Sequence, residues 1–293
     1  MGIFYAALGV YDSLALLNSI LFIQFLPSLG ISLPAMSHFA CHFFSIYRRT
    51  AIQTPSWMLV IITLDRFRSV CYPTKFKFME KKKFILKVIV FLFLAIFLLN
   101  ADHGWFYLVI RQTNQINFDP LLNTSTNTTI KKKICTASPL LLSITDIKMV
   151  FMRSYIPFTL MLFLNVKLSR VFLLSKKKFR PKEHDKKEYS FTTTVLIMNL
   201  VFFVLYLPWS VWYAVWTAFK FVPGAMTSQA SAQLRLCRSI LFSVAYLNNC
   251  SSFFVNFFIN FQFRKELMDI FRVIKKKKVS STIIQSTDNS SSK

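Results

Sequence analysis

The sequence predicts an all-α fold, a polytopic membrane bundle, from three observations. Hydrophobic residues make up 54% of the 293 residues, and phenylalanine alone contributes 33 of them. These residues gather in six apolar runs, each of about 20 or more residues, which is the length that crosses a bilayer as a helix. None of the runs alternates apolar and polar residues as the strands of a membrane barrel do, so we expect six transmembrane helices.

The expected helices cover most of the chain. Their approximate ranges are Ile3–Phe25, His38–Leu64, Phe84–Ile110, Met149–Leu174, Phe191–Ala218 and Ser239–Phe261. After them, apolar residues recur at helical spacing from Phe263 to Ile274 with charged residues between, which predicts a short amphipathic helix on the membrane surface. A membrane domain would then cover residues 1–275, and a basic, serine-rich disordered tail residues 276–293.

The positive charge of the chain indicates its orientation in the membrane. A net charge of +24 in a soluble protein would suggest nucleic-acid binding. Here the lysines and arginines form clusters after the second, fourth and sixth runs, so the positive-inside rule places these clusters and both termini in the cytoplasm. We therefore expect a multi-pass protein of the plasma membrane, with anionic lipid and not nucleic acid beside its basic clusters.

The loop between the third and fourth runs then faces the outside of the cell. It contains Cys135 and two N-glycosylation sequons, which begin at Asn123 and Asn127. We expect this loop to carry glycans.

Patterns of two other functional classes are missing from the sequence. The four histidines form no H-E-x-x-H or similar metal spacing, and no pair of acids lies within a run, so we expect neither an enzyme nor a cofactor. A transporter would show inverted repeats with glycine or proline at matching places, and five glycines offer little of that pattern.

A string of residues at the end of the second run relates the chain to a known family. Asp65, Arg66 and Phe67 are followed, after five residues, by Pro73, and Cys41 lies 25 residues before Arg66. That interval corresponds to about 37 Å of helix, enough to cross a bilayer with some tilt. The string and the interval resemble the third helix of rhodopsin-like G-protein-coupled receptors. Other residues in the family's order are Asp12, Pro157, Phe202 and Pro208.

The resemblance covers about residues 5–275, from the second helix of the seven-helix family to its surface helix, and is that of a divergent, peptide-receptor-like branch. It implies a receptor that transduces binding of an extracellular ligand to a heterotrimeric G protein. The ligand would shift the population of two helix packings, and Arg66 would become free for the G protein in the open one. A non-signalling truncated receptor form and a membrane transporter are the alternatives.

The resemblance also assigns switch residues. The family often carries an acid 20 residues before the proline that corresponds to Pro208, and that position is Glu188. An Arg66–Glu188 bridge would hold the cytoplasmic ends of two helices together, with Phe202 and Tyr206 as the aromatic residues before the proline pivot. In the alternative interpretation both charges face lipid headgroups and Pro208 is a structural kink.

Asp12 takes the place of the acid that binds sodium in this family. The family's helping residue on the third helix corresponds here to Pro55, which has no ligating side chain. Two interpretations of Asp12 follow. Either its carboxylate binds a sodium ion, or the carboxyl group is neutral and forms a hydrogen bond with Asn248. Two positions at which the family has tyrosines that stabilise the active state carry Asn165 and Asn256.

Arginines in the outer halves of the helices indicate the ligand. Receptors for amines carry an acid at the position of Arg48, so we expect a peptide, such as a neuropeptide, or a small anion. In an alternative, Arg48 and Arg49 pair with loop acids such as Asp119 or Asp146. The candidate ligand-pocket residues are Arg48, Arg49, Arg153, Arg238 and Trp209.

The resemblance has two further implications. A disulfide between Cys41 and Cys135 would tie the outer loop to its helix, with Cys237 as a competitor. The family also has an apolar helix before the one that bears Asp12, whereas Met1 lies only eleven residues before Asp12. We expect a missing upstream segment of about 20 apolar residues; a natural six-helix form is the alternative.

Overall fold

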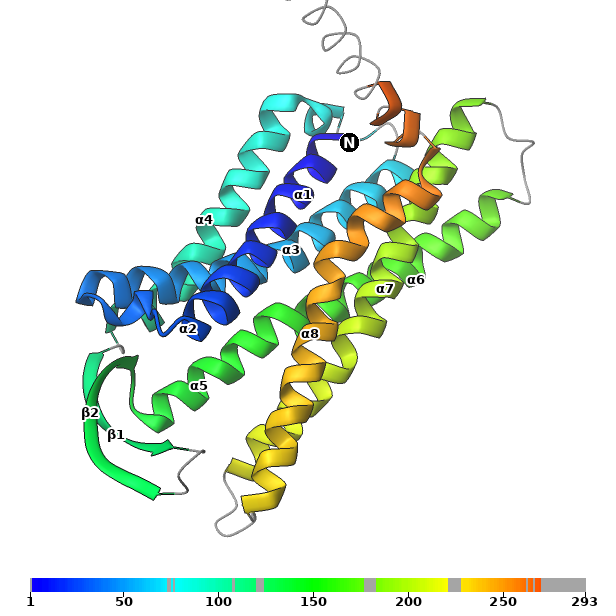
Figure 1. Cartoon of the computed structure of the whole chain (residues 1–293). Helices are drawn as coiled ribbons and strands as arrows, with labels where there is room; N and C mark the ends of the chain where they lie inside the picture. Colours follow the sequence, from blue (N-terminus) through cyan, green and yellow to red (C-terminus); the bar gives the residue numbers. More distant parts are fainter. Residues whose placement is uncertain are drawn as a thin grey trace, which may run out of the picture.

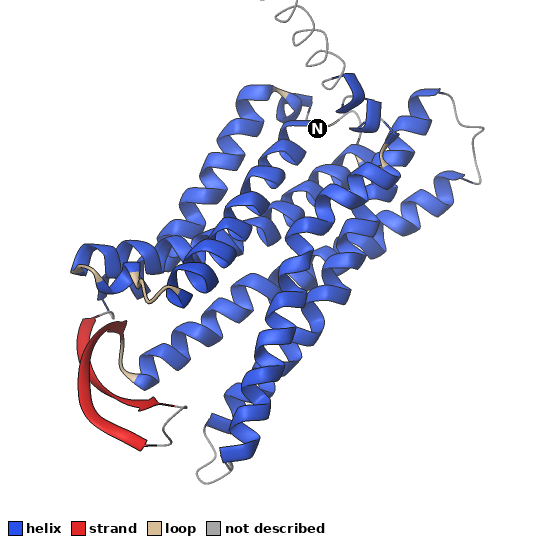
Figure 2. Ribbon diagram, viewed as in Figure 1, coloured by secondary structure: helices blue, strands red, loops and turns tan. Residues whose placement is uncertain are grey.

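The structure is a computed structural model, and it describes residues 2–72, 75, 77–106, 109–119, 124–176, 183–220, 228–261, 263–265 and 267–269. Its long helices pack side by side in a single bundle, with a β hairpin at the end opposite the N-terminus (Figure 1). The predicted all-α membrane bundle is confirmed, and the hairpin is the addition to it (Figure 2).

The helices form six continuous segments within the described ranges. In chain order the elements are α1 (Gly2–Leu17), the π-helical η1 (Asn18–Phe25), α2 (Leu26–Ser28), the 3-10 helix η2 (Leu33–Ala35), α3 (His38–Cys71), the 3-10 helix η3 (Lys77–Glu80), α4 (Lys82–Phe106), α5 (Pro139–Val150), the π-helical η4 (Phe151–Tyr155), α6 (Ile156–Lys176), α7 (Glu183–Lys220) and α8 (Ser228–Ile259). The chain runs without a break through α1, η1 and α2, and again through α5, η4 and α6.

Five of these segments are long and apolar enough to cross a membrane by length and composition. Within the described residues they are Gly2–Ser28, Lys82–Asp102, Leu140–Val171, Ser190–Trp216 and Leu236–Ile259. The predicted second span, α3, is not among them, although its 34 residues are long enough. Five charged residues lower its hydropathy: Arg48, Arg49, Asp65, Arg66 and Arg68.

The position of α3 explains how it tolerates these charges. It packs against α1, α4, α6 and α7, so much of its surface meets other helices instead of lipid. Polar groups inside a membrane are tolerated where they face the bundle interior. Arg49 and Arg66 are core residues of this kind, whereas Asp65 and Arg68 are half-buried and Arg48 is exposed, so the apolar content of α3 can be low.

The core and the outer surface of the bundle are both apolar. A cluster of buried side chains, which includes Leu8, Met58 and Phe202, joins α1, α3, α4, α6, α7 and α8. Large hydrophobic residues also cover the outside, for example Phe91 on α4 at 73% exposure and Phe258 on α8 at 67%. In a bilayer such side chains contact lipid, so their exposure costs nothing.

The outer loop folds into a hairpin that was not predicted. Its strands, β1 (Val109–Asp119) and β2 (Thr124–Thr136), pair in antiparallel register. Repeated threonines and isoleucines are the strand signal that was available in the sequence. Asn123 lies outside the described residues, and Asn127 lies on β2 with its side chain outside the description. The surface helix is described in part, since residues 263–265 and 267–269 are helical and the predicted positions beyond them are not described.

Candidate ligand site and cytoplasmic switch

The hairpin is fixed to the outer end of α3 by the expected disulfide. Cys41 lies in the first turn of α3, which Ser37 caps by accepting a hydrogen bond from the backbone N–H of Ala40 at 3.1 Å. Cys41 is bonded to Cys135 of β2, with 5.6 Å between their Cα atoms, while Cys237 has a free, exposed thiol. The loop that carries the sequons is thus anchored beside the outer ends of the helices.

Arg49 is held by protein groups. Its guanidinium forms an ion pair with Asp146 of α5 at 3.1 Å and donates a second hydrogen bond to the carbonyl of Thr145 at 3.0 Å. This is the alternative in which a loop-side acid satisfies the arginine, and it links the outer halves of α3 and α5. Arg48 and Arg238, by contrast, have exposed side chains.

Arg153 is a buried arginine that contacts tyrosine side chains, whereas Arg49 is paired with an acid. It lies on η4 at 2% exposure, and its Nη2 donates a hydrogen bond to the hydroxyl of Tyr206 at 2.8 Å. The Cζ atom lies 4.9 Å from the ring centre of Tyr206 and 5.4 Å from that of Tyr246, which are cation–π contacts. Its Nε has no hydrogen-bond partner, and no carboxylate in the described part of the chain forms an ion pair with it.

Aromatic side chains of α7 and α8 surround this arginine. Tyr206 stacks on Phe202 at 4.6 Å, and Tyr246 contacts Phe242 at 4.6 Å, between ring centres. Trp209, a predicted pocket residue, is 7% exposed and contacts Phe242 at 5.4 Å. The structure therefore brings Arg153, Tyr206 and Trp209 into one region, whereas Tyr246 had no signal of its own in the sequence.

Pro157 accounts for the placement of Arg153. Proline has no N–H, so the carbonyl four residues earlier, that of Arg153, loses its helical hydrogen bond. The helix widens there into η4. Such π turns are frequent at functional sites because the extra residue changes which side chains face inward.

The cytoplasmic ends of α3 and α7 meet at Arg66. This residue is fully buried, and its Cζ lies 5.1 Å above the ring of Phe191 on α7. Asp65 forms an ion pair with Arg68 at 2.9 Å. The side chain of Glu188, the predicted partner of Arg66, lies outside the described residues. Phe191 was not predicted, although it lies three residues after Glu188 and hence on the same helix face.

A buried asparagine joins three helices on the same side of the bundle. The side-chain amide of Asn199 on α7 donates hydrogen bonds to the Thr63 hydroxyl at 2.9 Å and to the side-chain oxygen Oδ1 of Asn165 at 3.0 Å. Asn256 of α8 contacts the neighbouring Met198 at 3.7 Å and donates to the Ser252 carbonyl at 2.8 Å. The two asparagines at the family's tyrosine positions thus lie beside consecutive residues of α7.

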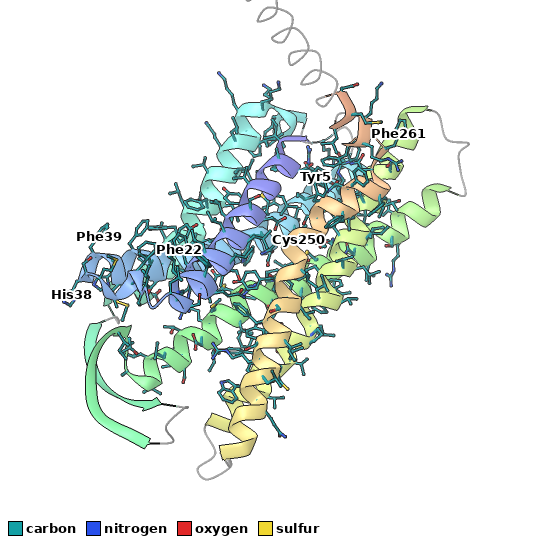
Figure 3. The ribbon with its side chains drawn as sticks, viewed as in Figure 1. Tyr5, Phe22, His38, Phe39, Cys250 and Phe261 are labelled. Atoms are coloured by element: carbon teal, nitrogen blue, oxygen red, sulfur yellow. A yellow bond between two sulfur atoms is a disulfide. The ribbon has the colours of Figure 1, made fainter. Side chains whose placement is uncertain are left out.

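Asp12 does not form the hydrogen bond with Asn248 that was one of the two alternatives. Its carboxyl is buried at 4% exposure, and neither oxygen has a hydrogen-bond partner in the structure. The reason is rotational: Asn249, one position further along α8, lines a cavity of about 710 Å³ together with Asp12. This cavity lies between α1 and α8, with Tyr5 and Cys250 on its walls (Figure 3).

Comparison with known protein families identifies the family of the chain. The seven-transmembrane receptor model of the rhodopsin family matches residues 1–252. No curated protein matches the chain. The matched range covers the helices that carry Arg66, Arg153 and Tyr206, and this family consists of receptors and not of enzymes. The chain therefore belongs to the rhodopsin family of seven-transmembrane receptors and is a multi-pass membrane receptor.

Proposed function

We propose that this receptor transduces the binding of an extracellular ligand, a peptide or a small anion, to a heterotrimeric G protein at the plasma membrane. The observation that supports this proposal is the complete burial of Arg66 against Phe191 of α7. In this packing the guanidinium is shielded from the cytoplasm. Any movement of α7 away from α3 would expose it.

The same helix also reaches the outer half of the bundle. Phe191 and Tyr206 are 15 residues apart on α7, about 22 Å of helix, and Tyr206 holds Arg153 through its hydroxyl. Pro208 lies inside α7 two residues beyond Tyr206, where it removes one backbone hydrogen bond. A ligand that displaces Tyr206 can therefore shift the inner end of α7, because one bent helix carries both contacts.

Nucleotide exchange on purified G proteins tests this function. With receptor in lipid nanodiscs, Arg66→Ala should lower stimulated exchange, and Phe191→Ala and Glu188→Ala should raise ligand-independent exchange about fivefold, the effect of about 1 kcal/mol on the two packings. Phe258→Ala is the matched control, since it removes a phenylalanine that faces lipid at 67% exposure.

The alternatives give different results in that experiment. A non-signalling form would bind ligand without exchange in any variant, and a transporter would show solute flux in sealed vesicles. If all variants equal the parent in basal and stimulated exchange, the proposed coupling is wrong. Glycans at Asn123 and Asn127 belong to the same proposal, and glycosidase treatment of surface protein would reveal them as a gel shift.

A further inference from the structure

We propose that Arg153 binds the carboxylate of the receptor's ligand and that the carboxylate releases the Tyr206 hydroxyl from this arginine. The inference rests on the proposed function, since it presumes that the outer half of the bundle takes up a ligand. The atoms involved are Nε and Nη2 of the guanidinium and the Tyr206 hydroxyl, which accepts a hydrogen bond from Nη2.

Arg153 forms no ion pair with an acid in the described part of the chain. Three other cations in the helices each have an acid within ion-pair distance: Arg49 with Asp146, Arg68 with Asp65 and Lys148 with Asp102. Arg153 is more deeply buried than Arg68 or Lys148, yet in the described structure its polar contact is a neutral hydroxyl. A buried charge without an ionic partner costs several kcal/mol, and a charged group inside a membrane protein therefore indicates a ligand or transport site.

One edge of the Arg153 guanidinium has a free donor, Nε. A guanidinium presents Nε–H and one Nη2–H side by side, and this pair matches the two oxygens of a carboxylate. Here Nη2 donates to Tyr206 at 2.8 Å and Nε donates to nothing. A carboxylate that binds both positions supplies the missing charge and competes with the tyrosine hydroxyl for Nη2.

The guanidinium of Arg153 lies among aromatic rings that carry hydroxyl groups. The hydroxyl of Tyr246 is buried, and its ring lies 5.4 Å from the Cζ atom of Arg153, so this hydroxyl is available as an additional donor. The neighbouring side chains are aromatic, because Phe202 stacks on Tyr206 and Phe242 contacts Tyr246. Sites with apolar walls and a few convergent polar groups suit an acid attached to a hydrophobic body. Such an acid is the C-terminus of a peptide that ends in an apolar residue, or a fatty acid.

Tyr206 connects carboxylate binding at Arg153 to the proline in α7. Tyr206 stands two residues before Pro208, and its hydroxyl holds α7 against η4. When a carboxylate takes over Nη2, this restraint on the bent part of α7 disappears. The arginine is thus a sensor, and Tyr206 transmits the change.

Equilibrium binding in the absence of G protein tests the inference. Full-length receptor in nanodiscs is titrated with N-acetylphenylalanine, with its carboxamide and with decanoate, and thermal unfolding is recorded alongside. We expect at least one acid to bind and to raise the unfolding temperature, and the carboxamide to bind at least tenfold more weakly than the acid. Binding of N-acetylphenylalanine alone assigns a peptide carboxylate, and binding of decanoate alone assigns a lipid carboxylate.

Variants complete the test. Arg153→Gln should weaken acid binding at least tenfold. Arg153→Lys should weaken it less, because a lysine keeps the positive charge and loses only the paired donors. Arg170→Gln, which removes an exposed cation from α6, is the matched control and should bind as the parent does. Arg153→Gln should also unfold at the same or a higher temperature without ligand, since it removes a buried charge that lacks an acid.

The inference is overturned if neither acid binds the parent, if the carboxamide binds as well as N-acetylphenylalanine, or if Arg153→Gln binds acids as the parent does. Should Arg153→Gln fail to fold, Arg153→Lys carries the comparison. Acid binding at Arg153 without nucleotide exchange would refute the proposed G-protein function and leave this site standing.

Discussion

At the scale of single residues, Asn199 connects more helices than its position in the sequence suggests. Its side-chain NH₂ group donates hydrogen bonds to Thr63 of α3 and Asn165 of α6, while its side-chain oxygen Oδ1 is buried without a hydrogen-bond partner. Asn256 also has an unpartnered carbonyl oxygen and lies beside Met198. Where the family uses tyrosines, this receptor therefore places short amides around one segment of α7.

We expect Asn199→Ala to loosen the closed packing. It removes two interhelical hydrogen bonds, which should lower the free energy of unfolding by about 1–2 kcal/mol, since such bonds contribute about 0.6 kcal/mol each in membranes and leave buried acceptors behind. Ligand-independent exchange should rise because α7 loses a restraint. Thr159→Ala is the control, as its hydroxyl bonds only within its own helix. Equal stability of Asn199→Ala and the parent would contradict this role.

A second prediction compares two ion pairs. Asp146→Ala leaves Arg49 buried without its acid, and because about a third of the Asp146 side chain is exposed we expect a loss of about 1–3 kcal/mol, less than for a fully buried pair. Asp102→Ala breaks the pair with Lys148, whose members are 44% and 30% exposed, and should cost about 0.2–1 kcal/mol. Chemical unfolding in detergent measures both, and the reverse order would show that Arg49 does not depend on Asp146.

At the scale of elements, the sequence predicts the number and order of the helices because each apolar run has membrane length. It does not predict where a helix widens. Pro157 was identified, but a missing N–H can produce a kink, a π turn or a water-filled gap, and packing against α3 and α7 decides among them. The contact of Arg153 with Tyr206 depends on that π turn. The sequence therefore indicates both residues as site candidates, but it does not predict the hydrogen bond between them.

The contact between Arg66 and α7 at the cytoplasmic end is also only partly predictable from the sequence. The Asp65–Arg66 string marks a helix end in the sequence, but the aromatic partner of Arg66 depends on the rotation of α7. Phe191 lies over Arg66 and is three residues after Glu188, a relation of position that becomes meaningful only after the two helices are known to pack. The hairpin was missed because polar strands in an outer loop lack the alternating apolar pattern on which strand prediction depends.

The disulfide allows a prediction about the outer loop as an element. Cys41→Ser would free the hairpin from α3 and open a loop of 94 residues, and chain entropy predicts a loss of about 4–5 kcal/mol, less any strain. Cys237→Ser should leave stability unchanged, because that thiol is free. Thermal unfolding under oxidising conditions compares the variants. Peptide mapping of unreduced protein that finds Cys41 alkylated would disprove the bridge in the cell.

At the scale of the whole molecule, the cavity between α1 and α8 stands apart from the rest of the bundle. A buried carboxyl, Asp12, and the amides of Asn249 and Asn256 line a space of about 710 Å³ there. Asp12 and the carbonyl oxygens of both asparagines have no hydrogen-bond partner. Lipid tails offer no donor, so this face is unfavourable in a bilayer as it stands.

One wall of the cavity is suited to close contact with another helix. Gly2, Ala6, Gly9 and Ser13 lie along α1 at small-residue spacing, and a Cβ atom added at Gly2 or Gly9 would meet nothing within 4 Å. Small residues at such spacing let two helix backbones approach closely in membranes. An apolar helix with an amide at mid-length would fill the space and give the Asp12 carboxyl a hydrogen-bond donor.

We therefore predict that a transmembrane helix supplied to this cavity stabilises the receptor. A segment of about 20 leucines and alanines with one central asparagine, fused ahead of Gly2 or coexpressed, should raise the unfolding temperature and the amount of receptor at the cell surface. The same segment with leucine in place of the asparagine should help less, since it leaves Asp12 without a donor. Gly9→Leu should abolish both gains, because its side chain occupies the wall that the added helix contacts. Gains that persist in Gly9→Leu would place the helix on another face of the bundle, and the unpaired carboxyl would then need a different partner.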